Sequence, residues 1–458
     1  MSDFSGQLYV PGDAGFDEAV FARVFNARRP TDRMPSAVLV AENEHDVAAG
    51  VRYAADNGLS VAVRSGGHSW AVWSVQNNTL LIDLGKLKTP EFDEKTGIVS
   101  AGPAIEGGNE LDAFLAERGR FFNGGHCPSV GIGGFLLQGG QGWCERGWGW
   151  GAESVVAIDV VTAEGELVRA DAEQNSDLYW AARGAGPSFP GIVTMFHLKT
   201  RPRFQHLFHS VQVYDIADFA EVMTWMYEVE PTISPDVEIV CVSLCPPSTD
   251  GEPRTRVFVV TGLALSESED AAREALAPLQ TCPLIDRAFE NSVTESSLAE
   301  QRESQIQMNP EHWRYYADNV WVDGEAHDII RALTPVFTTS PEPDAFTIWF
   351  GNGLMRELPD MAFSLQSPAY IATYLAYEDS ANDARNRAWL NDAMVAAQPV
   401  TVGQYLGDSD MTNRQLKFMN DDNFAKLQKI IADRDPEGRF VRYLAHDSAT
   451  VNRNHWEV

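Results

Sequence analysis

Along the first 200 residues of the chain, segments with apolar residues at helical spacing alternate with short apolar segments typical of strands. Residues 43–57 carry apolar side chains at helical spacing and end at Gly58, which predicts a helix closed by a glycine. Segment 176–182 predicts a second helix with Ser176 as its N-terminal cap. The same patterns predict a helix at 109–118, buried strands at 59–63, 80–84 and 191–198, and a β-hairpin formed by 155–162 and 166–170.

The pattern changes beyond residue 203, where glycine becomes less frequent. Strands are expected at 237–244, 256–265 and 345–350, and helices at 269–277 and 421–432. This arrangement is typical of an antiparallel sheet with helices on one face.

Since strand residues alternate between faces, at most one of Trp349 and Phe350 lines a pocket. The aromatic segment with Trp143, Trp148 and Trp150 fits either core packing or the wall of a substrate entrance.

Length and charge limit the possible classes of protein. With 458 residues, the chain is long enough for two domains, or for one domain with a large insertion. A formal net charge of −30 disfavours nucleic acid or an anionic membrane as a partner. There is no basic and apolar leader and no apolar run long enough to span a membrane, so neither a secretory signal nor a membrane span is expected. The scattered cysteines, which suggest no disulfide framework, favour a reducing cytoplasm. The sequence does not indicate an oligomeric state.

The cysteines do not form a recognisable disulfide or zinc pattern. The five are odd in number and scattered, at positions 127, 144, 241, 245 and 282. Cys241 and Cys245 have no second pair to complete a zinc site, so no metal is expected. One cysteine is therefore a candidate for a chemical role.

Two glycine-rich segments contain the strongest candidate chemistry. His68 lies in Arg64–Trp70, and Cys127 lies in the segment 123–134. Dense glycine indicates close backbone approach or positive φ, and a cofactor with a pyrophosphate and a flat ring requires both. A covalent bond to that cofactor would explain the imidazole and the thiol. The alternatives are a hydrogen-bonded turn histidine and a buried, inert cysteine. No Rossmann fingerprint is present, which disfavours NAD.

Together these segments resemble the anchoring motifs of the vanillyl-alcohol-oxidase-type flavoproteins, also called PCMH-type, and in particular the berberine-bridge-enzyme-like branch. Segments 25–35, 177–184 and 423–440 resemble that branch as well. The resemblance implies an α+β fold with a discontinuous PCMH-type FAD-binding domain formed by residues 1–204 and 408–458. A substrate domain with an antiparallel sheet and helices, residues 205–407, is inserted between the two parts.

The resemblance also implies roles for individual residues. His68 would bond the 8α-methyl carbon of FAD and Cys127 would bond C6. Val130, three residues after Cys127, would admit O2 to the flavin. Tyr405 is the first candidate for the catalytic base, although the family's usual Tyr and Asn at positions 402 and 404 are Val and Gln here. The remaining implied FAD contacts are Arg64, Ser65, Gly66, Gly67, Ser69, Gly131, Gly133, Gly134, Gly191, Ile192 and Val193.

The implied function is a bicovalent FAD oxidase. Hydride would pass from a C–OH or C–N substrate to flavin N5, and O2 would reoxidise the flavin to give H2O2. One alternative is a biosynthetic dehydrogenase or oxidative cyclase with another electron acceptor. Another is a catalytically silent flavin- or carbohydrate-binding protein. The sequence does not select among sugars, alcohols, alkaloids, phenolics and polyketides as the small-molecule substrate.

Overall fold

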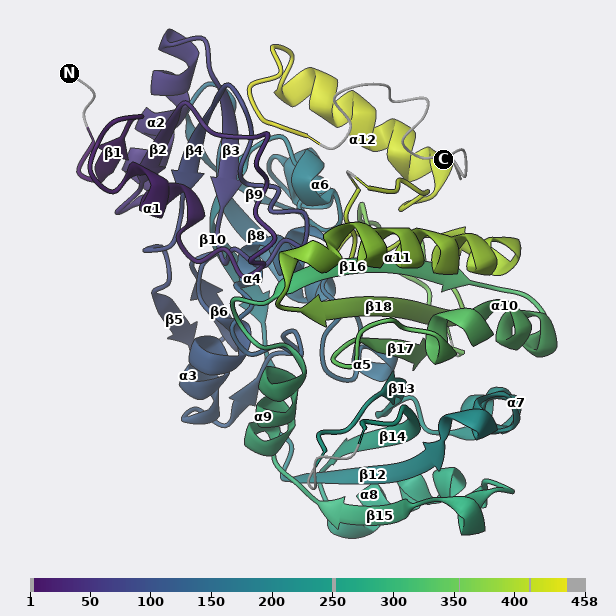
Figure 1. Cartoon of the computed structure of the whole chain (residues 1–458). Coiled ribbons are helices and arrows are strands. Elements are labelled where there is room, and N and C mark those ends of the chain that lie inside the picture. Colours follow the sequence, from purple (N-terminus) through teal and green to yellow (C-terminus); the bar gives the residue numbers. More distant parts are fainter. Residues whose placement is uncertain (1–3, 249–252, 354, 412, 443–458) are drawn as a thin grey trace.

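The chain folds into two lobes, and the sheet with the most strands forms the second lobe (Figure 1). The computed structural model describes residues 4–248, 253–353, 355–411 and 413–442. The expected α+β fold is confirmed. The domain boundaries at 204/205 and 407/408 remain predictions, and the ends of the first domain, 1–3 and 443–458, lie outside the described residues.

The first lobe contains a four-stranded and a five-stranded sheet. In the four-stranded sheet, with the order β1-β2-β4-β3, β4 runs parallel to both β2 and β3, whereas β1 is antiparallel. The five-stranded sheet has the order β5-β6-β10-β8-β9 and is antiparallel. The strands are β1 Gln7–Tyr9, β2 Ala37–Val40, β3 Ser60–Arg64, β4 Thr79–Asp83, β5 Pro90–Asp93, β6 Ile98–Ala101, β8 Val155–Val161, β9 Leu167–Asp171 and β10 Ile192–Lys199, with a separate pair, β7 Arg120–Phe121 and β11 Arg201–Pro202.

Helices of the first lobe are short apart from α2 and α12. The helix α12 follows the second lobe in the sequence but packs against α6 of the first (Figure 1). Arg434 on α12 forms an ion pair with Asp177 on α6 at 2.7 Å. The helices are α1 Phe16–Phe21, α2 Glu44–Asp56, α3 Asp112–Ala116, α4 Ile132–Leu137, α5 Glu145–Trp148, α6 Ser176–Ala181 and α12 Asp421–Arg434.

The second lobe is an eight-stranded antiparallel sheet with the order β15-β12-β14-β13-β17-β18-β16-β19. Its strands are β12 His206–Asp215, β13 Val237–Leu244, β14 Val257–Ser266, β15 Glu290–Glu295, β16 Arg314–Val322, β17 Phe346–Gly351, β18 Ala369–Tyr377 and β19 Thr401–Gly403. Its helices are α7 Phe219–Val229, α8 Glu269–Leu276, α9 Leu298–Met308, α10 Ala326–Thr338 and α11 Asp383–Ala397.

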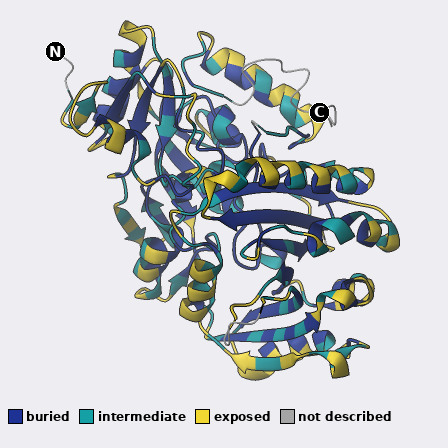
Figure 2. Cartoon of the chain, in the orientation of Figure 1, coloured by how far each residue is buried: buried dark blue, intermediate teal, exposed yellow. Residues whose placement is uncertain are grey.

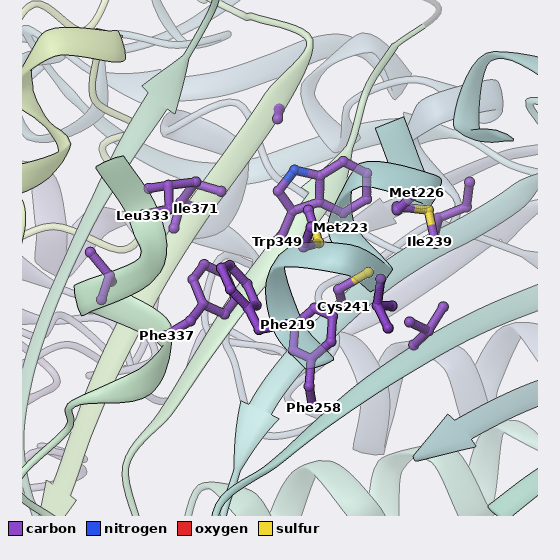
Figure 3. Close-up of a cluster of buried hydrophobic side chains, with 14 of the residues drawn as sticks. Phe219, Met223, Met226, Ile239, Cys241, Phe258, Leu333, Phe337, Trp349 and Ile371 are labelled. Atoms are coloured by element: carbon purple, nitrogen blue, oxygen red, sulfur yellow. The ribbon is translucent and has the colours of Figure 1, made fainter. Parts of the chain in front are cut away.

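Helices α7, α8, α10 and α11 cover one face of this sheet, and the other face meets the first lobe. Figure 3 shows the helix-covered side, where Trp349 and Ile371 from the sheet pack near Phe219 and Phe337 from α7 and α10. The central strands are buried on both faces, while the covering helices expose their outer sides (Figure 2). The face toward the first lobe is therefore the one available for a site.

Two local predictions differ from the structure. Residue Ser176 is not a cap but the first residue of α6, because Asn175 precedes the helix in a left-handed conformation with φ 46°. Asparagine tolerates that conformation, and its amide donates to the Arg169 carbonyl at 2.7 Å. The helix expected at 109–118 begins with a π-helical turn at Gly107–Leu111 before α3. Within the described residues, no helix is long and apolar enough to cross a membrane.

Candidate active site

A cavity of about 490 Å³ lies between the glycine-rich loops of the first lobe and the open face of the eight-stranded sheet. The structure brings every residue singled out above for the cofactor and the chemistry to the wall of this cavity. From the first lobe these are Arg64, Ser65, Gly66, Gly67, His68, Ser69, Cys127, Val130, Gly131, Gly133, Gly134, Gly191, Ile192 and Val193, and from the segment after β19 Tyr405.

The two glycine-rich loops are in backbone contact. A Cβ atom on Gly66 would lie 2.6 Å from the backbone nitrogen of Gly131, so neither position has room for a side chain. Gly67 adopts φ 85°, and a Cβ atom there would lie 2.0 Å from the carbonyl oxygen of Arg23. Glycine is therefore required for the loop conformation and for the close approach.

Backbone amides in the first loop are free to bind an anion. Within the described part of the chain, the N–H groups of residues 65–69 donate to no protein acceptor. Successive free amides around a positive-φ glycine form an anion-binding nest. The Arg64 side chain is occupied by a buried ion pair with Asp83 at 2.5 Å. The loop therefore fits a pyrophosphate through its backbone rather than through this guanidinium group.

His68 is held in the cavity as a neutral imidazole. Its ring stacks on Phe25 with centroids 4.5 Å apart, and its Nε2 lies 3.1 Å from the hydroxyl of Ser129 in the Cys127 loop. Burial lowers the pKa of His68 to about 4. The ring therefore keeps a lone pair at neutral pH, which a bond to carbon requires.

Cys127 faces the same cavity but is not an activated thiol in this structure. Burial, together with the nearby Asp408 carboxylate, raises the pKa of Cys127 to about 12. This environment disfavours the thiolate form of Cys127. A bond from Cys127 to a ring therefore needs another group to accept the thiol proton.

The hydroxyl of Tyr405 is turned toward the backbone of the first lobe. It accepts hydrogen bonds from the N–H groups of Gly140 and Gln141 at 3.2 and 3.1 Å. Burial and the Asp408 carboxylate raise the pKa of Tyr405, although these two N–H groups act in the opposite direction. The guanidinium group of Arg314 on β16 pairs with Asp383 on α11.

Strand alternation determines which aromatic residues of the sheet reach the site. Phe350 lines the cavity, whereas Trp349 points to the opposite face and hydrogen-bonds Tyr227 at 3.1 Å. Of the aromatic residues at 143–150, Trp143 lines the cavity and packs on His126, while Trp150 packs in the interior against Trp321 and Phe363. Trp150 therefore belongs to the core and Trp143 to the cavity wall, while a substrate entrance at Trp143 stays a prediction.

The sequence did not single out three polar groups of the cavity. Asp408 receives hydrogen bonds from Tyr370 on β18 at 2.7 Å and from Trp70 at 3.4 Å. Glu238 on β13 bonds the ring of His126 at 3.0 Å and the backbone N–H of Cys144 at 2.8 Å. Burial lowers the pKa of His126, but Glu238 together with Asp408 and Glu145 raises this pKa overall. Of these three groups, only Asp408 could have been suspected from the sequence, because it lies three residues after the candidate base Tyr405.

No metal site accompanies these groups: within the described ranges, no three or more His, Cys, Asp or Glu side chains cluster as metal ligands would.

Comparison with known proteins identifies the family. The FAD binding domain family matches residues 35–171. An FAD-linked oxidoreductase of Penicillium janthinellum is 34% identical over 92% of this chain and 93% of its own length. The chain belongs to the FAD-linked oxidoreductases. The cofactor of this FAD-linked oxidoreductase is therefore FAD, and its prediction as an enzyme is confirmed.

Other relatives of the FAD-linked oxidoreductase include oxidases. A carbohydrate oxidase of Microdochium nivale is 34% identical over 42% of this chain and 39% of its own length. Solved structures share the fold at lower identity. The 6-hydroxy-D-nicotine oxidase of Arthrobacter nicotinovorans superposes with a TM-score of 0.82 at 19% identity, covering 96% of this chain and 97% of its own. Berberine bridge enzyme gives 0.80 at 16% identity, covering 96% and 95%. The resemblance to the berberine-bridge-enzyme-like flavoproteins is confirmed at the level of the fold.

Proposed function

We propose that this FAD-linked oxidoreductase is an oxidase with FAD attached through two bonds, from His68 to the 8α-methyl carbon and from Cys127 to C6. The convergence of these two side chains on one cavity, from loops in backbone contact, is the main support for the proposal. The free amides of residues 65–69 fit the pyrophosphate of the same cofactor. Each bond forms with loss of one hydrogen from FAD and one from the side chain, and O2 takes the two electrons and two protons.

FAD supplies the hydride acceptor, and the residues of the chain orient the substrate and hold its proton. Val130 lines the cavity, and we assign it the role of leaving space for O2. Return of electrons to O2 then gives H2O2. The proton of the substrate O–H or N–H requires a base in the cavity, for which Tyr405 and Asp408 are the candidates.

The cavity favours a substrate with an apolar body. Val240, Val242 and Leu244 alternate toward it along β13, and Val259 and Ile348 extend this wall on the neighbouring strands. Much of this wall is only partly buried, so its apolar surface is open to an occupant. Burial of an apolar ligand there is favourable, whereas a sugar would lose hydrogen bonds to water. We therefore propose an apolar alcohol or amine rather than an oligosaccharide.

The first experiment is to precipitate the purified holoenzyme with acid and record the visible spectrum of the redissolved pellet. A yellow pellet is expected, and intact mass then shows whether FAD is attached. His68→Ala and Cys127→Ala should each keep one bond, and the double variant should release its flavin on denaturation. Covalent flavin in the double variant would contradict the assignment of the two anchors.

A second measurement tests the oxidase assignment. Apolar alcohols, amines and sugars are screened anaerobically for reduction of the flavin, and the reduced enzyme is then mixed with air-saturated buffer. Rapid return of the flavin colour with H2O2 formation is expected. Slow return in air but rapid return with an artificial acceptor would instead favour the dehydrogenase alternative.

A further inference from the structure

Asp408 is a carboxylate in an otherwise aromatic part of the cavity. It lies in the segment between β19 and α12, lines the cavity and keeps part of its surface open. The hydroxyls of Tyr370 and Tyr374 donate to it from β18, the first at 2.7 Å. The indole N–H of Trp70, from the first lobe, donates at 3.4 Å. Donors from both lobes therefore fix the orientation of this one acid.

The strand β18 explains this arrangement. Tyr370 and Tyr374 are four residues apart and so share the face that meets the first lobe, with Ala372 between them. Tyr374 stacks on Phe346 of β17 with centroids 4.7 Å apart and lines the cavity, while Tyr370 is fully buried behind it. The two phenols are therefore rigid donors that hold the carboxylate against the cavity.

Tyr405 is poorly placed to accept a proton. A neutral phenol has one proton to donate and two acceptor positions. Gly140 and Gln141 N–H groups occupy both acceptor positions of Tyr405. Only the phenolate form would be basic, and burial disfavours that charged form. The neutral hydroxyl of Tyr405 is thus not placed to act as a base in this structure.

We propose that Asp408 is the catalytic base of this enzyme and that Tyr370 and Trp70 are positioning residues for its carboxylate. The inference rests on the proposed function, since it requires FAD bonded to Cys127 through C6. That ring carbon is adjacent to the carbon that carries N5, the hydride acceptor. Asp408 and Cys127 line the same cavity, so we place the carboxylate on the N5 side of the ring.

The proposed step balances. The substrate C–H bond would break with its hydrogen and electron pair passing to FAD as a hydride, and the neighbouring O–H or N–H bond would break with its electrons kept on oxygen or nitrogen. These electrons form the new C=O or C=N bond, and the released proton forms an O–H bond on Asp408. Asp408 would return that proton to solvent, and O2 would take two electrons and one proton from the reduced FAD and a second proton from solvent, which gives H2O2.

The surroundings of Asp408 suit this role. Titratable groups facing it are Tyr370 and Tyr374 from β18, Tyr405 from its own segment, and His126 and Cys127 from the first lobe. Burial raises the pKa of Asp408 above its usual value, while the hydrogen bonds from the two β18 tyrosines and Trp70 act in the opposite direction. A carboxylate whose conjugate acid has a raised pKa is a stronger base.

Sodium sulfite tests the location of Asp408 without a substrate, because sulfite adds to N5 of oxidised flavins and bleaches their visible colour. In the holoenzyme, a negative charge near N5 would disfavour an anionic adduct. Asp408→Asn is therefore expected to tighten sulfite binding about tenfold near neutral pH. Tyr405→Phe should leave the sulfite Kd within about threefold. The matched control is Asp410→Asn, in the same segment, which removes a carboxylate that pairs with Arg28 at 3.1 Å.

The base role is tested with the compound that reduces the wild-type flavin fastest in the anaerobic screen. Asp408→Asn should slow flavin reduction at least a hundredfold and abolish the acidic limb of its pH profile. Tyr370→Phe removes one donor and should move that limb to higher pH, and it provides a second test if Asp408→Asn does not fold. Unchanged sulfite binding in Asp408→Asn, or loss of the pH limb in Tyr405→Phe alone, would overturn the proposal. Non-covalent flavin by intact mass would instead contradict the proposed attachment.

Discussion

Gly66 and Gly131 touch through their backbones, and a Cβ atom on Gly66 would lie 2.6 Å from the nitrogen of Gly131. This contact joins the loop that carries His68 to the loop that carries Cys127. The spacing of the two candidate anchors therefore depends on the absence of two side chains. A hydrogen bond between Ser129 and His68 at 3.1 Å links the same loops.

Substitution of Gly66 by alanine is expected to separate these loops. The overlap is with backbone on both sides, so it should cost about 1–3 kcal/mol of stability. It should also lower the ratio of FAD to protein. Thermal unfolding and visible absorbance check both effects. Gly124→Ala is the control, because its Cβ would meet the Phe122 ring at an ordinary 3.7 Å. Equal effects of the two substitutions would show that the contact between Gly66 and Gly131 contributes neither to stability nor to FAD binding.

Trp349 and Phe350 should respond differently to truncation, because they lie on opposite faces of β17. Trp349→Ala leaves a cavity in the core beneath α7 and should lower the free energy of unfolding by about 3–5 kcal/mol. Phe350→Ala changes the cavity wall and should chiefly raise KM for an apolar substrate. Chemical denaturation and steady-state kinetics separate the two effects. A KM change in Trp349→Ala alone would contradict the assignment of faces.

Glu145 predicts a pH dependence of stability. Burial, reinforced by Glu238, raises its pKa to about 8 from 4.5. The stabilising contribution of the protonated carboxyl is complete below about pH 4.5 and is lost as the pH rises to about 8, at up to about 1.4 kcal/mol per pH unit. Glu145→Gln should remove this loss and be more stable than the wild type at pH 8.

The same unfolding curves provide the control for this prediction. Glu117 is an exposed glutamate, with 78% of its side chain accessible. Glu117→Gln should follow the wild type across the whole pH range. If the stability of Glu145→Gln also follows that of the wild type at every pH, the prediction is wrong and the carboxyl of Glu145 is ionised in the folded protein at neutral pH.

Val130 provides a test of oxygen access. It lines the cavity three residues after Cys127, and a larger side chain there would fill space beside the proposed flavin ring. Val130→Leu is expected to slow reoxidation of the reduced enzyme by O2 at least tenfold, with little effect on reduction by substrate. Stopped-flow absorbance measures the two half-reactions separately. Equal reoxidation rates would leave Val130 as a packing residue.

The local chain pattern was sufficient for most secondary structure. The predicted strand at 237–244 coincides with β13, because Ile239 and Cys241 alternate with Val240 and Val242 between a helix-covered core and a cavity wall. Periodicity of this kind is carried by neighbouring residues and needs no distant contact. The failures were at helix starts, where Asn175 rather than Ser176 precedes α6 and a π-helical turn precedes α3.

The sequence by itself determined the candidate anchors and the family, because His68, Cys127 and their glycines form contiguous segments with recognisable spacing. Only the tertiary structure decided which other groups share their cavity. Asp408 and Tyr374 come from separate segments and meet because β18 packs against the first lobe. Tyr405 likewise has two backbone donors from the first lobe. Such contacts depend on how two lobes pack, which short-range patterns along a chain do not encode.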